Sequence, residues 1–65
     1  MRISDLRERL TASFGEQWAP SFSKDIVISD LGGRTVDEAL AAGEEADVIW
    51  KAVCKLHPVE TAKQQ

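Results

Sequence analysis

The sequence predicts an all-α protein, a compact bundle of about four short helices. Apolar residues recur at four-residue spacing in four segments, which is the pattern of helices that bury one face. Glycine or proline separates these segments, and the single run of β-branched residues has no second strand to pair with. A chain of 65 residues is long enough for one domain only. We expect residues 1–57 to form that domain and residues 58–65 to form a flexible tail.

The first helix is expected over residues 5–14. Ser4 is a favourable N-cap residue, and Asp5 in the first turn complements the positive end of the helix dipole. Gly15 then ends the helix. The residues expected on its buried face lie four positions apart: Leu6, Leu10 and Phe14.

A second helix is expected between Glu16 and about Ile28. Its apolar residues again lie four positions apart: Trp18, Phe22 and Ile26. Pro20 lacks an N–H group, so either the helix begins near Pro20 or residues 16–19 form a separate turn. Residues 26–28 are β-branched and also compatible with a short strand, but we favour the helix because no partner strand is available.

A short third helix follows Gly32 and Gly33, which end the preceding segment. Thr35 and Glu38 form a capping box, in which the threonine hydroxyl and the glutamate carboxylate each accept a hydrogen bond from the other residue's amide. Gly43 stops the helix after about two turns. A helix this short must be stabilised by packing against its neighbours.

The fourth helix is expected from Glu44 or Glu45 to about Leu56, because Pro58 disfavours helical geometry at the residue before it. Acidic residues stand near its start and lysines near its end, as the helix dipole favours. Its buried stripe is expected to contain Ala46, Ile49, Val53 and Leu56.

Charge and cysteine content limit the class of protein. The formal net charge is −3, and residues 25–65 carry four basic and eight acidic side chains, so an acidic surface disfavours nucleic-acid binding without excluding it. Cys54 is the single cysteine, which rules out an internal disulfide and indicates a reducing compartment. Neither a membrane span nor a signal peptide is evident, so we expect a soluble cytoplasmic protein with no membrane partner.

Two stretches of the chain carry a resemblance to a known family. They are LGGRTVDEALAAG at residues 31–43 and IWKAVC at residues 49–54. With them the chain resembles, over residues 1 to about 56, the actinobacterial family catalogued as domain of unknown function 3046, although arginine is expected at the position of Lys51. The resemblance implies a small uncharacterised helical protein and no particular activity. It hints at a DNA-repair setting, because genes of the family lie near recombinase genes.

Gly33, Arg34 and Thr35 form a candidate anion-binding site. Free N–H groups at a helix start, next to a guanidinium, can bind a phosphate or carboxylate. The alternative interpretation is structural: the glycines end one segment, the threonine caps the next helix, and Glu38 competes for the same amides.

Residues 35–56 have the spacing of a helix-turn-helix, with a small residue at Ala39, a turn glycine at Gly43 and an apolar residue at Ile49. The residues at the start of its second helix, however, are acidic and oppose DNA: Glu44, Glu45 and Asp47. A DNA-associated accessory protein is therefore the alternative function.

No catalytic constellation is evident, and we expect no enzyme activity, no cofactor, no metal site and no small-molecule substrate. Cys54 and His57 lie three positions apart, but two ligands do not make a zinc site. A free cysteine more often packs as a small hydrophobe. A chain this short also has little room for the pocket of about 300 Å³ or more that ligands usually occupy.

The aromatic residues give the leading functional hypothesis. Two tryptophans and two phenylalanines are many for four short helices to enclose, and tryptophan with a cationic neighbour is typical of protein interfaces. We therefore expect a noncatalytic protein–protein interaction module whose partner is another protein or a second copy of the chain. The alternative is that the aromatic residues all belong to the core. The candidate partner-binding residues are Trp18, Phe22, Arg34 and Trp50.

Overall fold

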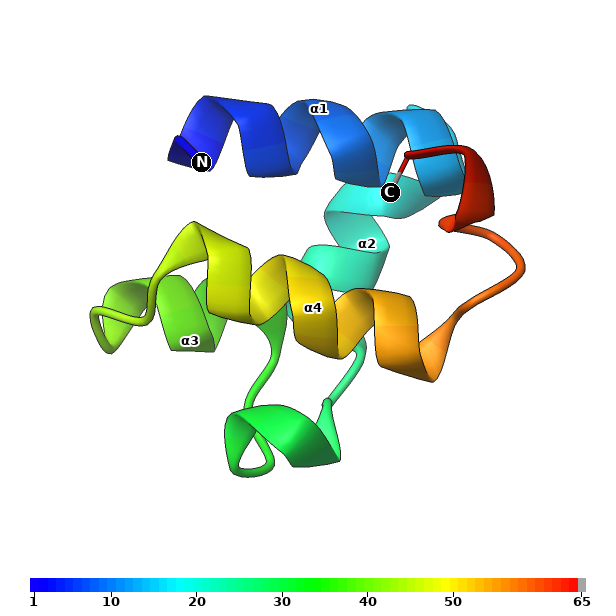
Figure 1. Cartoon of the computed structure of the whole chain (residues 1–65). Coiled ribbons are helices and arrows are strands. Elements are labelled where there is room, and N and C mark those ends of the chain that lie inside the picture. The colour runs from blue at the N-terminus through cyan, green and yellow to red at the C-terminus, as the bar shows by residue number, and fades with distance from the viewer. Residues whose placement is uncertain (65) are drawn as a thin grey trace.

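The computed structural model describes residues 1–64 and contains four α-helices and two short 3₁₀ helices (Figure 1). The α-helices are α1 (Ile3–Phe14), α2 (Trp18–Asp25), α3 (Val36–Ala41) and α4 (Ala46–Leu56). The 3₁₀ helices are η1 (Ser29–Leu31) and η2 (Ala62–Gln64). No strand is formed within residues 1–64, so the predicted all-α class and small helical bundle are confirmed.

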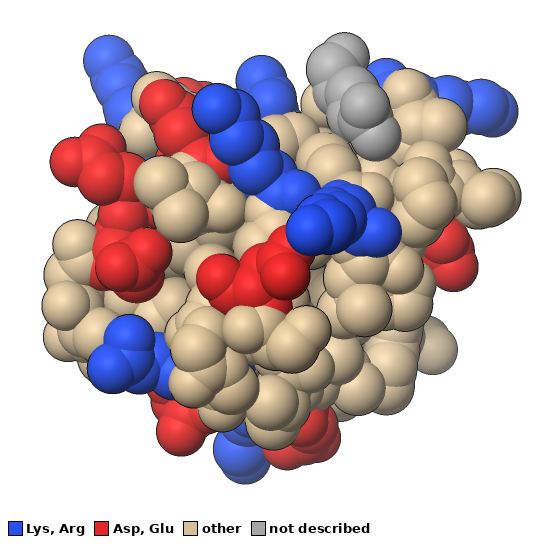
Figure 2. All heavy atoms as spheres, turned by 60° about the horizontal axis from the view of Figure 1, so that its bottom comes forward, with Lys and Arg blue, Asp and Glu red and all other residues tan. Residues whose placement is uncertain are grey.

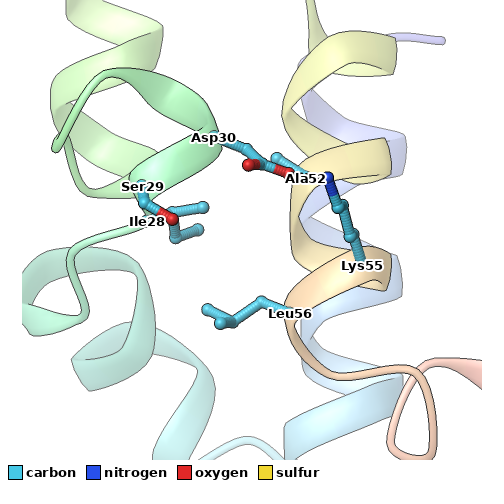
Figure 3. Close-up of a pocket in the computed structure, with 6 residues that line it drawn as sticks. All are labelled: Ile28, Ser29, Asp30, Ala52, Lys55 and Leu56. Carbon is cyan, nitrogen blue, oxygen red and sulfur yellow. Dashed lines mark ion pairs between the residues drawn. The ribbon is translucent and has the colours of Figure 1, made fainter.

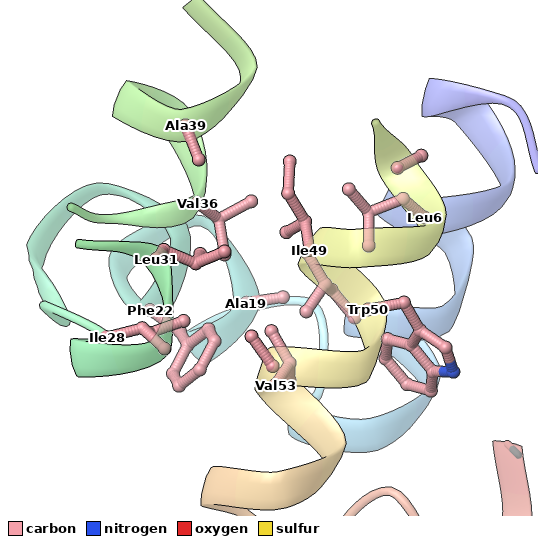
Figure 4. Packing of buried hydrophobic residues seen from close by; sticks show 13 residues of the cluster. Leu6, Ala19, Phe22, Ile28, Leu31, Val36, Ala39, Ile49, Trp50 and Val53 are labelled. Atoms are coloured by element: carbon pink, nitrogen blue, oxygen red, sulfur yellow. The ribbon is translucent and has the colours of Figure 1, made fainter. Parts of the chain in front are cut away.

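The helices enclose a single core (Figures 1 and 4). Helix α1 contacts α2, α4 and η2, whereas α3 contacts α2 and α4, and η1 lies against α4. Every α-helix buries one face, as its four-residue spacing predicts. The buried apolar residues form one cluster: Leu6, Leu10, Ala19, Phe22, Ile28, Leu31, Val36, Ala39, Ala46, Ile49, Trp50, Ala52 and Val53.

Helix α1 begins two residues earlier than predicted, at Ile3. The expected N-cap Ser4 is therefore wrong, since this residue lies inside the first turn. Arg2 occupies the N-cap position, and its backbone N–H donates a hydrogen bond to Asp5 Oδ2 at 3.0 Å. Asp5 thus satisfies the backbone at the helix start from the third helical position, where a carboxylate also meets the favourable end of the dipole.

Helix α2 is shorter than predicted at its C-terminal end. It begins at Trp18, so Pro20 lies in the first turn, where a backbone N–H has no intrahelical acceptor to lose. It ends at Asp25, and the prediction of helix as far as Ile28 is wrong. The β-branched side chains of residues 26–28 favour extended backbone, in agreement with the extended conformation of Ile26 and Ile28.

The extended segment is held by a tight loop instead of by a strand. Ile28 and Arg34 form an isolated antiparallel bridge, in which the Ile28 N–H donates to the Arg34 carbonyl at 3.0 Å. Between them, η1 is followed by Gly32 and Gly33 with φ of 73° and 77°, a region that favours glycine. The two glycines reverse the chain, so one bridge forms without a second strand.

Helices α3 and α4 form where the sequence predicts them. The Glu38 N–H donates to Thr35 Oγ1 at 3.1 Å and the Thr35 N–H donates to Glu38 Oε1 at 2.9 Å, which confirms the capping box. In α4, Ile49 and Val53 are fully buried. Leu56 was expected to be buried with them and is not, because 44% of its surface is exposed.

The C-terminal residues fold back towards α1. Thr61 is buried, its hydroxyl donates to the His57 carbonyl at 2.8 Å, and η2 contacts α1. The His57 ring stands edge-on to the rings of Phe14 and Phe22, which stack on each other with centroids 4.3 Å apart. The flexibility expected of residues 58–65 stays a prediction, and residue 65 lies outside the described residues.

Candidate functional site

A shallow groove lies between η1 and the C-terminal half of α4 (Figure 3). Its volume is about 170 Å³. In the close-up, Ile28 and Leu56 point towards one another from opposite sides of this groove, which we call the η1–α4 groove. Its lining residues are Ile28, Ser29, Asp30, Ala52, Lys55 and Leu56.

An ion pair closes one side of the η1–α4 groove. Lys55 Nζ lies 3.3 Å from Asp30 Oδ2, which joins η1 to α4 (Figure 3). Both side chains are substantially exposed, so the pair contributes little to stability, about 1 kcal/mol or less. The pair matters mainly for the arrangement of the groove, because it holds a cation and a carboxylate next to the apolar residues that line it.

The groove exists because η1 covers only part of α4. Ile28 and Ala52 form its floor and are almost fully buried, whereas Leu56 on the last turn of α4 is 44% exposed. Sequence reasoning placed Leu56 in the core because it continues the apolar stripe of the helix. The sequence did contain a signal that Leu56 is exposed, because this residue stands at the end of its helix, two residues before Pro58.

The four candidate partner-binding residues divide into two pairs. Phe22 and Trp50 belong to the core, with 1% and 5% of their surfaces exposed (Figure 4). Trp18, at the start of α2, is 47% exposed, and Arg34 is exposed in the loop after η1. Trp50 also has the Arg9 guanidinium 5.7 Å from its ring centroid, a cation–π contact within the chain.

Two amides of the candidate anion site, those of Gly33 and Thr35, already have acceptors within the protein. The Thr35 N–H donates to Glu38 Oε1, and the Gly33 N–H donates to the Ile28 carbonyl at 3.2 Å. The bond from Thr35 to Glu38 is the competition that the structural interpretation of this turn predicts. Arg34 itself is exposed and forms no ion pair within residues 1–64.

The helix pair over residues 35–56 has a compact turn between α3 and α4, at residues 42–45. Ala39 and Ile49 are both fully buried between the helices, as the helix-turn-helix spacing requires. The residues at the start of α4 are exposed and acidic: Glu44, Glu45 and Asp47. On the face shown in Figure 2, blue and red side chains are interspersed around a broad uncharged area, and no wide basic surface forms there.

The remaining chemistry-bearing groups are dispersed. Cys54 is half-buried and packs against the edge of the core, and within residues 1–64 no three histidine, cysteine or acidic side chains come together as metal ligands would. A second hollow, of about 130 Å³, lies between α1 and α2, and Arg7 beside it is paired with Asp37 at 2.8 Å. No helix in the described part of the chain is both long and apolar enough to cross a bilayer.

Comparison with known proteins identifies the family. The family described as "Protein of unknown function (DUF3046)" matches residues 1–59. No curated protein and no solved structure matches the chain. The matched residues include all four α-helices and η1, and therefore the whole η1–α4 groove. Since the match spans nearly the entire sequence, the chain belongs to this family of proteins of unknown function.

Proposed function

We propose that the protein is a noncatalytic protein–protein interaction module of the cytoplasm that binds its partner through the η1–α4 groove. The observation that carries this proposal is that Leu56 lines the groove with 44% of its surface exposed, beside a floor of Ile28 and Ala52 that is almost fully buried. Covering the exposed part of such an apolar side chain removes it from water, which favours association with another molecule.

The size of the groove supports a protein partner over a small molecule. Ligand pockets usually measure about 300 to 1,000 Å³, and this groove, at about 170 Å³, is smaller. Its open side suits one or two aliphatic side chains projecting from a partner surface. The cytoplasmic location is supported by the lone cysteine, since disulfides stabilise many small proteins outside the cell.

Affinity capture from a cell extract, with bound proteins identified by mass spectrometry, tests the proposal. Leu56→Gln removes an apolar wall of the groove, and Val59→Gln makes the same kind of change at a side chain that is 83% exposed and does not line it. We expect a protein that is retained by the unsubstituted chain and by Val59→Gln and lost with Leu56→Gln.

Two results of this capture experiment would contradict the proposal. One is that no protein is retained by the unsubstituted chain, and the other is that retention is the same for both variants. Light scattering on the unsubstituted chain and on the two variants tests whether the partner is a second copy of the chain. A mass above that of the monomer, lost only in Leu56→Gln, would then identify the chain as its own partner.

The DNA-associated alternative rests on the packing of α3 against α4, with Ala39 and Ile49 buried in the helix-turn-helix pattern. The acidic residues at the start of α4 weigh against it because they face the position that phosphates would take. Titration of a short DNA duplex at low salt tests this alternative, which predicts micromolar binding that weakens steeply with added salt.

A further inference from the structure

We draw no further inference here: the strongest candidate, the hollow between α1 and α2 that is lined by Leu10, Pro20 and the buried Ser23, carries nothing, because its cation, Arg7, is already paired with Asp37 and nothing in the structure shows what covers it.

Discussion

Trp18 and Trp50 have the same side chain in opposite environments. Trp50 is 5% exposed, lies in the core beneath Arg9, and contributes to the stability of the bundle. Trp18 is 47% exposed at the start of α2, so much less of its apolar surface is removed from water. Burial of an aromatic side chain stabilises a fold in proportion to the apolar area that is covered. The two residues should therefore differ both in their fluorescence and in their importance for stability.

Tryptophan fluorescence can measure this difference. Trp18→Phe leaves Trp50 as the emitter, and we expect emission at shorter wavelength with weak quenching by acrylamide. Trp50→Phe leaves Trp18, and we expect emission at longer wavelength with strong quenching. Circular dichroism serves as the control that both variants remain helical. Equal quenching of the two variants would contradict the burial described here.

At the scale of the elements, helix ends are determined by side chains that bond to the backbone. In α3, Thr35 and Glu38 bond reciprocally to each other's amides, and this helix of six residues depends on them. In α1, Ser4 belongs to the first turn and Asp5 bonds to the Arg2 N–H instead. The two helix starts therefore use different residues, although both begin near a hydroxyl-bearing side chain.

Removing the hydroxyl of Thr35 or that of Ser4 distinguishes the start of α3 from the start of α1. Thr35→Ala should lower the free energy of unfolding by about 1 kcal/mol, because the Glu38 amide loses its acceptor. Ser4→Ala should change it by less than about 0.5 kcal/mol, because Ser4 is exposed and caps no helix. Urea denaturation measures both values. Thr35→Ser, which keeps the acceptor, is the matched control, and a loss for Ser4→Ala as large as that for Thr35→Ala would show that our account of α1 is wrong.

At the scale of the whole molecule, surface ion pairs link elements that are distant in sequence. Arg7 pairs with Asp37 between α1 and α3, and Lys55 pairs with Asp30 between α4 and η1. The side chains of both pairs are more than two-fifths exposed. Exposed pairs of this kind typically contribute about 0.2 to 1 kcal/mol and are screened by salt. Stability therefore comes mainly from the buried apolar cluster.

The dependence of stability on salt concentration tests whether the buried apolar cluster contributes more than the surface ion pairs. Raising sodium chloride from about 0.05 M to about 1 M shortens the Debye length to about 3 Å and should lower the free energy of unfolding by no more than about 1 kcal/mol. By contrast, Val53→Ala, which leaves a cavity at a fully buried site, should cost about 2 kcal/mol or more in the same urea experiment. A larger effect of salt than of Val53→Ala would show that charge pairs, and not the core, hold the bundle together.

The sequence by itself determined the features that depend on near neighbours. The four-residue spacing located all four helices, and the capping box at Thr35 and the glycines after η1 located the turns, because a helix and its caps are made by residues within about four positions of each other. The same local reasoning misplaced the start of α1, where Ser4 is not the N-cap, and missed the end of α2. There it relied on the absence of a partner strand, whereas the β-branched residues needed only one bridge to Arg34.

The tertiary structure alone decided which apolar residues are covered. Trp18 and Trp50 fit the same helical pattern, and Leu56 continues the stripe of Ile49 and Val53, yet only Trp50, Ile49 and Val53 are buried. The η1–α4 groove likewise depends on Asp30 and Lys55, which are far apart in the chain and meet only after folding. Periodicity gives the direction in which a side chain points, but burial depends on whether a distant element packs above it, and that is a property of the assembled bundle.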